Sequence, residues 1–237
     1  QLSANKISQE QARGINDRLQ ALYQSGTANA DAIRALGLIR DRSAVALILA
    51  RLDDEHEEVR AAAVDWRGLD ETAFGHRLRG VQGRLGRDGM VGETIVEALA
   101  AAVEAARRSL AFEAYDTQIY AALVMLDNRL AEMATGEGKT LAAALAAAVG
   151  ALAGIPVHVL TANDYLVARD AAGLAPFYVS LGLRVACVTG SMDETQRRAA
   201  YGASVCYVTA RELVFDYLRD GQRRGFARSD LQRRSEE

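Results

Sequence analysis

The spacing of hydrophobic residues divides the chain into two long parts and a tail. Across residues 1–127, apolar positions recur with the period of an amphipathic helix, and there is no proline. Across residues 128–220, short apolar runs of strand length alternate with amphipathic helical stretches. Residues 221–237 are polar and charged, which predicts a frayed or disordered tail.

The first part changes its pattern near Trp66, where we predict a boundary. Within residues 31–64, helical runs are punctuated by Asp41 and by the pair Asp53-Asp54, a pattern similar to one unit of a HEAT-type helical repeat. An ordinary helical hairpin explains the pattern equally well, because HEAT units bury their faces by stacking on one another. The predicted regions are a helical HEAT-like segment at 1–66, a helical lead-in at 67–127, an α/β region at 128–220 and a charged tail at 221–237.

The second part alternates strands with helices. Residues 70–86 and 93–112 are predicted as two helices that precede it. The elements then expected are strand 129–133, helix 139–150, strand 155–160, helix 163–181, strand 183–188, helix 191–201, strand 204–208 and helix 210–219. This alternation predicts an α/β fold, a parallel sheet with right-handed crossovers and helices on both faces. Ligands of such sheets bind at the carboxyl ends of the strands, where residues 136–138 fall.

A glycine turn, TGEGKT at residues 135–140, follows the first predicted strand and opens an alanine-rich helix. Gly136 and Gly138 permit the backbone angles and the close approach that a phosphate group needs. Lys139 supplies a charge for the β- and γ-phosphates, and Thr140 a hydroxyl for Mg²⁺. Met133 holds the position of the first glycine of the general P-loop pattern. A turn that merely caps the helix is the alternative interpretation.

Gln118 lies upstream of this turn, in the stretch 112–125. Its amide offers one donor and one acceptor, which match the N6 and N7 edge of adenine. Phe112 and Tyr115 are close enough in sequence to pack near the base. Taken alone, a single glutamine on a helix is better explained as a solvated side chain.

Composition narrows the classes of partner. The net charge of −3, from 28 basic and 31 acidic residues, does not favour nucleic acid. The three histidines and two cysteines show no metal-ligand spacing, and Cys187 and Cys206 are expected to be buried, reduced thiols. No apolar run reaches the roughly 20 residues that span a bilayer and no signal peptide is visible, which predicts a cytosolic protein.

Several motifs occur in the order and spacing of a known family. AEMATGEGKT, VHVLTANDYLVARDA, PFYVSLGLRVACVTG and YGASVCYVTARELVFDYLRD closely resemble the first nucleotide-binding domain of SecA, the motor ATPase of bacterial preprotein translocation. The upstream EAARRSLAFEAYDTQ resembles the Q motif of that family, which reads adenine. The similarity runs from about Leu69 to Asp220, and the family also has methionine at the position of Met133.

The resemblance implies a P-loop motor half of the RecA/DEAD-like type that binds ATP or ADP with Mg²⁺. In it Gln118 recognises adenine, Thr140 holds the metal through the nucleotide, and Arg169 faces the phosphates. The nucleotide-binding residues implied in this way are Gln118, Thr135, Gly136, Glu137, Gly138, Lys139, Thr140 and Arg169.

Two further motifs carry implied roles. Asn163, Asp164 and Tyr165 belong to a motif that couples the nucleotide site to neighbouring domains. The stretch FDYLRD closes the domain, and its Phe215 and Tyr217 are as consistent with core positions as with function.

The sequence also departs from the family. The departures are Ala134 for a basic residue, Ser204 for an acidic one, VTA at 208–210 for GTN, Ala121 and Ala122 for two glycines, and residues 1–66, which do not resemble the start of typical SecA proteins. The acidic Walker B motif expected after Asp220 and the arginine finger are not found, so the catalytic residues are unknown. Because hydrolysis uses such groups, weak nucleotide binding and very slow turnover are expected of this chain.

Three functions of different classes remain open. The first is the ATP-binding part of a SecA-like motor, truncated before Walker B, that couples ATP hydrolysis to protein translocation. Its partners would be the Sec translocon channel and unfolded preproteins, in the cytoplasm or at the inner face of the cell membrane. The second is a non-catalytic SecA-like scaffold or regulatory module, whose helical N-terminal segment binds a protein partner. The third is a nucleic-acid helicase, which the net charge and the TGEGKT and FDYLRD motifs disfavour, so no nucleic-acid partner is expected.

Overall fold

The computed structural model describes the backbone of residues 42–224 and the side chains of residues 52–222. The chain divides into two compact units, residues 1–57 and residues 58–237. Helix α3 (Arg42–Arg67) begins in the first unit and ends in the second.

Helix α3 runs without interruption through Asp53 and Asp54, so the predicted punctuation there is wrong. Both aspartates are exposed on the helix surface, and the helix continues past them. Asp41 and the rest of the HEAT-like segment before it lie outside the described residues. The likeness to a HEAT unit and the predicted boundary at Trp66 stay predictions.

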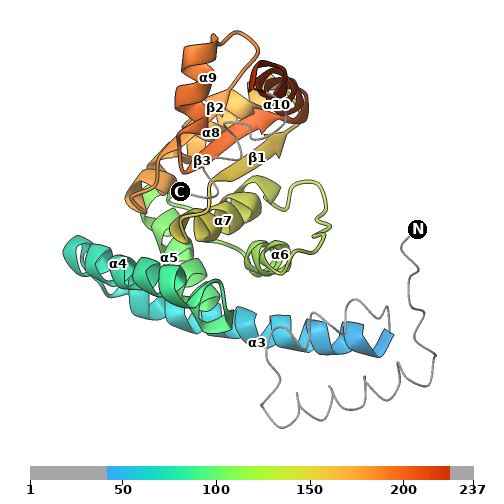
Figure 1. Cartoon of the computed structure of the whole chain (residues 1–237). Helices are drawn as coiled ribbons and strands as arrows, with labels where there is room; N and C mark the ends of the chain where they lie inside the picture. Colours follow the sequence, from blue (N-terminus) through green and yellow to red (C-terminus); the bar gives the residue numbers. More distant parts are fainter. Residues whose placement is uncertain (1–41, 225–237) are drawn as a thin grey trace. The chain divides into compact units, whose positions relative to one another are not determined.

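The second unit follows the predicted order of helices and then alternating strands and helices (Figure 1). After α3 its elements are α4 (Glu71–Asp88), α5 (Gly92–Leu110), α6 (Asp116–Leu126), α7 (Lys139–Leu152), β1 (Val157–Thr161), α8 (Asp164–Ser180), β2 (Val185–Val188), α9 (Glu194–Tyr201), β3 (Val205–Thr209) and α10 (Ala210–Arg224). The predicted helices and three of the four predicted strands therefore occur near their expected positions.

Side-chain caps set the first residues of several helices. Asn163 accepts a hydrogen bond from the backbone N–H of Leu166 at 2.9 Å, which starts α8 where the sequence predicted it. Asp193 and Gln196 form a capping box at α9. This box explains why α9 begins at residue 194 and not at the predicted residue 191.

The sheet has three parallel strands in the order β1-β3-β2. The central strand β3 is buried along its whole length, and its side chains alternate between two faces. Cys206 and Val208 pack in one cluster with residues of α9 and α10. On the opposite face the hydroxyl of Tyr207 lies 3.0 Å from the hydroxyl of Tyr178 on α8. Helices therefore cover both faces of a parallel sheet, as the sequence predicted (Figure 1).

The strand predicted at residues 129–133 is wrong. These residues alternate in burial as an extended chain does, but no strand of the described part of the chain pairs with them. Leu130 is 93% exposed, which no strand inside a sheet would allow. Extended backbone becomes a strand only when a neighbour supplies hydrogen bonds, and the sequence of five residues does not contain that information.

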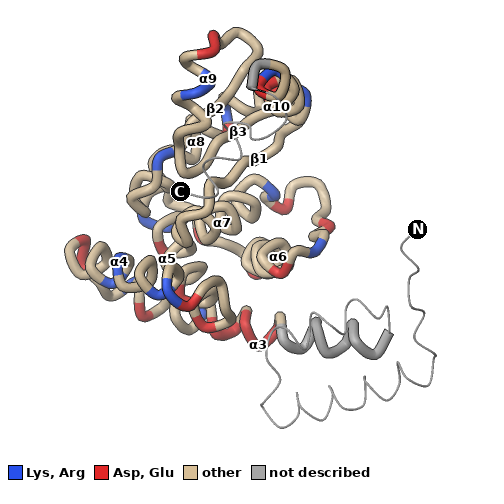
Figure 2. The backbone as a smooth tube through the Cα atoms, in the orientation of Figure 1, with Lys and Arg blue, Asp and Glu red and all other residues tan. Residues whose placement is uncertain are grey.

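Helices α5 and α7 are rich in alanine and largely buried. Small side chains let α7 pack closely on α5, α6 and β1. At Gly150, for example, an added Cβ would lie 3.2 Å from a methyl group of Val157 on β1. Charged residues lie on helices and loops, and the three strands carry none (Figure 2). No helix in the described part combines the length and hydrophobicity that crossing a bilayer requires.

The two cysteines are free thiols as expected, but only Cys206 is buried, and the expected burial of Cys187 is wrong because it is half-buried. Burial raises the pKa of Cys206 to about 12, and it also raises the pKa of Cys187. Both side chains are therefore neutral at physiological pH and behave as small apolar groups of the sheet.

Helix α10 corrects one prediction and decides one question that the sequence left open. It continues to Arg224, so residues 221–224 of the predicted frayed tail are helical, while residues 225–237 lie outside the described residues. Phe215 is 55% exposed and Tyr217 is 41% exposed, so neither belongs to the core. The buried side of α10 is taken by two carboxylates instead, Glu212 and Asp216.

These two carboxylates bind one buried arginine of α9. Arg197 donates to Glu212 at 2.7 Å and to Asp216 at 2.9 Å, and the hydroxyl of Tyr201 also donates to Asp216 at 2.9 Å. Burial opposes the charged form of Arg197, but the two carboxylates outweigh it and raise the pKa of the guanidinium. This network joins α9 to α10 on one face of the sheet.

Replacing Arg197 with methionine is expected to lower the free energy of unfolding by about 3–5 kcal/mol, because two buried carboxylates would lose their partner. Urea unfolding followed by circular dichroism measures the change. The matched control is Arg198→Met, which removes the neighbouring exposed guanidinium and its pairing with Glu194. A loss below about 1 kcal/mol for Arg197→Met would show that the network contributes little to stability.

Candidate functional site

The predicted phosphate turn lies between α6 and α7 and begins a helix as expected. Gly136 has a φ of 93° and Gly138 a φ of 77°, in the left-handed region that favours glycine. Gly138 is the N-cap of α7, and no side chain of the described residues caps this helix end. The amides of the first turn of α7, beginning at Lys139 and Thr140, therefore retain the capacity to bind an anion.

Two charged side chains at the turn, Lys139 and Glu137, form hydrogen bonds with the backbone of Ala134. The Lys139 ammonium donates to the carbonyl oxygen of Ala134 at 2.7 Å. The Glu137 carboxylate accepts from the backbone N–H of Ala134 at 2.7 Å. Both bonds are exposed to solvent, so they are exchangeable, and a phosphate group would compete with the Ala134 carbonyl for the ammonium.

Gln118 is the upstream residue that the structure brings to this turn. It lies in the first turn of α6 and is only 5% exposed. Its side-chain nitrogen donates to the carbonyl oxygen of Glu137 at 3.0 Å, across 19 positions of sequence. Its side-chain oxygen accepts from the backbone N–H of Tyr115 at 3.0 Å. The amide thus connects the start of α6 to the phosphate turn.

The contact between Gln118 and the turn depends on the absence of a side chain at Gly138. A Cβ at Gly138 would lie 2.1 Å from the side-chain nitrogen of Gln118. Sequence reasoning assigned Gln118 to adenine and missed this second contact. The amide keeps one N–H and one acceptor lone pair beyond the two bonds described, so adenine recognition by the same side chain stays a prediction.

Two aromatic side chains flank this region. Phe112 and Tyr115 belong to the segment between α5 and α6, and both are largely exposed. Exposed aromatic rings beside Gln118 offer an apolar surface on which a base can pack. Their predicted packing near the base stays a prediction.

Arg169 is not brought into contact with the turn. It lies on α8, and both of its hydrogen bonds in the described part of the chain go to Asp170, at 2.9 and 2.6 Å. No hydrogen bond of Arg169 among the described residues therefore tests its predicted orientation toward the phosphates. Arg169 stays a candidate from the resemblance alone.

The residues predicted to couple the site to other domains lie at the carboxyl end of β1. Asn163 caps α8, while Asp164 accepts from the backbone N–H of Gly190 at 2.8 Å and so holds the loop after β2. Tyr165 beside them is largely exposed. Sequence reasoning did not find the Asp164–Gly190 contact, because it joins the start of α8 to a loop 26 positions later in sequence.

The parallel sheet and the glycine turn before α7 define the class of the protein as an α/β domain of the DEAD-like type. The family described as SecA DEAD-like domain matches residues 37–235, so the chain belongs to this family. The match begins at residue 37, so the expectation that residues 1–66 do not resemble this family is wrong for residues 37–66. Residues 37–66 show only a general helical pattern of apolar positions, which contains no motif specific to this family.

The similarity to individual relatives covers part of each protein. The chain is 44% identical over 164 residues to protein translocase subunit SecA 2 of Bordetella avium, covering 69% of this chain and 25% of that protein. It is 40% identical over 172 residues to protein translocase subunit SecA 1 of Alkaliphilus metalliredigens, covering 73% and 19%. For protein translocase subunit SecA of Anaplasma marginale the identity is 47% over 133 residues, covering 56% and 15%. The chain therefore spans a quarter or less of the length of these relatives.

Replacing Gly138 with alanine is expected to lower the free energy of unfolding by about 1 kcal/mol through its positive φ. Displacing Gln118 from its two hydrogen bonds adds about 1–2 kcal/mol. Gly154→Ala is the matched control, because Gly154 has a φ of 80° and open space where its Cβ would lie. Urea unfolding of both variants separates the strain from the contact.

A double-mutant cycle tests the cause. In a Gln118→Ala background, Gly138→Ala should lower the free energy of unfolding by no more than Gly154→Ala does, because the side chain that collides with the new Cβ is gone. If Gly138→Ala still lowers the free energy of unfolding more than Gly154→Ala in this background, the contact with Gln118 is not the cause of the difference.

Proposed function

We propose that this chain is the ATP-binding part of a SecA-like motor ATPase. The observation that carries the proposal is the hydrogen bond from Gln118 to the Glu137 carbonyl, which joins the Q-motif segment to the glycine turn before α7. The turn fits a phosphate group, because Gly136 leaves open space at its Cβ position and the start of α7 lacks a side-chain cap. Two segments that the family uses for one nucleotide are thus adjacent.

The residues proposed to hold ATP or ADP follow from this arrangement. The backbone of Thr135, Gly136, Glu137 and Gly138 would surround the phosphates, and Lys139 would turn from the Ala134 carbonyl toward them. The Thr140 hydroxyl would bind Mg²⁺ through the nucleotide. The nucleotide supplies the phosphoryl chemistry, and these residues bind and orient it.

The role of the whole motor is proposed from the family. The relatives are named as protein translocase subunits, and the family couples ATP hydrolysis to moving unfolded preproteins through the Sec channel. Because the chain spans a quarter or less of these relatives, hydrolysis, those partners and a cytoplasmic or membrane-peripheral location are proposals for this chain.

The alternative is a non-catalytic SecA-like binding module. It is favoured by the internal bonds of Glu137 and Lys139 to residue 134, where the family usually has a basic residue and this chain has alanine. In this alternative the turn keeps its shape without a nucleotide, and the helical N-terminal segment binds a protein partner.

Calorimetric titration with Mg·ADP tests the phosphate turn. Lys139→Ala is expected to weaken binding by about 10- to 100-fold, because it removes a charge-assisted hydrogen bond to phosphate. Arg129→Ala is the control, since it removes a nearby cation that Asp127 already holds at 2.7 Å. Absence of binding at millimolar Mg·ADP, in protein that melts cooperatively, would contradict the proposal and favour the binding module.

Comparing ADP with GDP tests the proposed recognition of adenine by Gln118. The wild-type protein is expected to prefer ADP, and Gln118→Ala should weaken ADP binding far more than GDP binding, because only adenine offers the matching N6 and N7 edge. An equal loss for both nucleotides would instead show that Gln118 acts only by holding the turn. Unfolding of each variant in urea controls for a general loss of structure.

A further inference from the structure

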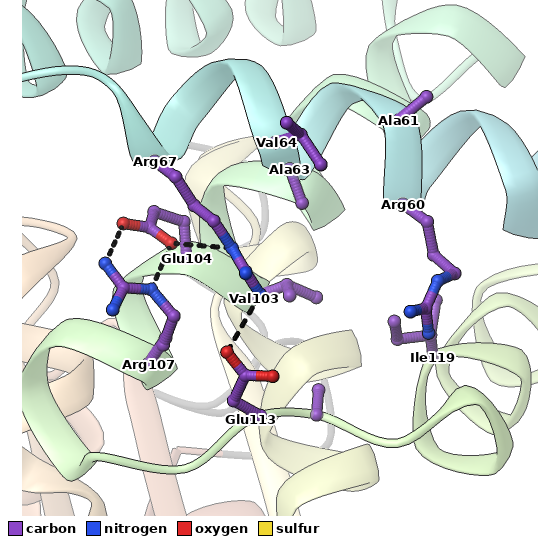
Figure 3. Close-up of a pocket in the computed structure, with 11 residues that line it drawn as sticks. Arg60, Ala61, Ala63, Val64, Arg67, Val103, Glu104, Arg107, Glu113 and Ile119 are labelled. Atoms are coloured by element: carbon purple, nitrogen blue, oxygen red, sulfur yellow. Dashed lines mark hydrogen bonds and ion pairs between the residues drawn. The ribbon is translucent and has the colours of Figure 1, made fainter.

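A cavity of about 300 Å³ lies in the second unit, between the end of α3, the middle of α5 and the segment that leads into α6 (Figure 3). Its charged lining residues are Arg60, Arg67, Arg107, Glu104 and Glu113. Gln118 and residues 134–140 are not among the described residues that line it. The cavity is therefore lined by other residues than those proposed to hold the nucleotide, and a ligand in it goes beyond the proposed function.

The buried carboxylate of Glu104 interacts with three guanidinium groups, two of which line this cavity. Glu104 is 1% exposed. It accepts two hydrogen bonds from Arg107 at 2.8 Å and one from Arg108 at 2.6 Å, and Arg67 lies 3.9 Å away. Burial alone would raise the pKa of Glu104, but these arginines outweigh burial and lower it, so the carboxylate stays charged. Among the charged residues that line the cavity, the three arginines Arg60, Arg67 and Arg107 outnumber the two carboxylates Glu104 and Glu113.

The carboxylate nearest to the Arg67 guanidinium lies at the surface. The outer guanidinium nitrogen lies 3.0 Å from a carboxylate oxygen of Glu113, and both side chains are exposed (Figure 3). Arg60 pairs in the same way with the exposed Asp116. Exposed pairs contribute little to stability, so a carboxylate that enters the cavity can replace Glu113 at Arg67. A planar guanidinium binds a carboxylate through two parallel hydrogen bonds.

The remaining wall is apolar. Val64, Val103 and Ile119 line the cavity together with three alanines. The volume is at the lower end of the range of small-molecule sites, which suits a ligand with one compact apolar group.

We propose that this cavity binds a small organic carboxylate. Its carboxylate occupies the position of Glu113 at Arg67, beside Arg107, and its apolar body packs on Val103 and Ile119. Binding at Arg67 would free the segment that contains Glu113, three residues before the start of α6.

The single tryptophan of the chain reports on this site. Trp66 is buried, precedes Arg67 directly, and accepts a hydrogen bond from Arg108 at its carbonyl oxygen at 2.9 Å. Its fluorescence is measured while benzoate is added at constant ionic strength. We expect a saturable change with benzoate, and binding at least tenfold weaker for benzamide, which has the same shape without the charge.

Two variants locate the binding. Arg67→Met keeps the apolar stem and removes the guanidinium, and it should weaken benzoate binding at least fivefold. Glu113→Gln removes the competing carboxylate and should tighten binding at least twofold, which no merely structural effect would produce. Arg198→Met is the matched control, because Arg198 is also an exposed guanidinium paired with an exposed carboxylate, and benzoate binding should be unchanged. Circular dichroism melting shows that each variant is folded.

Three outcomes would overturn the proposal. Equal binding of benzamide and benzoate would show that the cavity does not select a charge. Binding of inorganic phosphate at least as tight as benzoate would show that the apolar wall plays no part. Unchanged benzoate affinity in folded Arg67→Met, or weaker affinity in Glu113→Gln, would place the ligand elsewhere.

Discussion

The candidate site depends on the space that Gly138 leaves open by having no side chain. The amide of Gln118 occupies that space and donates to the carbonyl of the preceding residue, Glu137. The same residue, Gly138, is the N-cap of α7 and needs its positive φ to turn the chain into the helix. Any side chain at this position would therefore disturb both the backbone of the turn and its connection to α6.

The turn can hold a ligand in a constant position only if helix α7, which follows it, is itself held in place. Helix α7 is packed against α5, α6 and β1, and its alanines and Gly150 allow a close approach to each of them. A site placed on the end of a rigid helix holds its amides in a constant direction, whereas the preceding residues 129–137 are mostly exposed. Helix α7 presents its backbone amides and Lys139 at its first turn, and the exposed segment before it supplies Glu137 and the Ala134 carbonyl to which Lys139 bonds.

The sequence was most informative where structure is decided locally. The glycine turn at 136–138, the helix from Asn163 and the strand at 204–208 each depend on nearby residues, and these elements occur where they were predicted. The failure concerns neighbours far apart in the chain, because a strand at 129–133 needs a pairing partner that its own five residues do not supply. The place of Phe215 stayed open for a similar reason, since its exposure depends on which side of α10 meets α9. The bond between Gln118 and Glu137 could not be predicted for the same reason, although both residues were candidates for the site.

The two arginine–carboxylate clusters show why similar charges lead to different roles. Around Arg197, a buried cation is enclosed by two buried carboxylates, and the side chains fill the space between α9 and α10. Around Glu104 the arrangement is reversed, because a buried anion lies near the guanidinium groups of Arg67, Arg107 and Arg108, and two of these, Arg67 and Arg107, line a cavity. A buried charge that is enclosed by its partners keeps few donors or acceptors for a ligand, and removing one partner is costly. Guanidinium groups that lie at the edge of a cavity retain donors for a ligand, which is why the first cluster holds two helices together and the second is the candidate for binding.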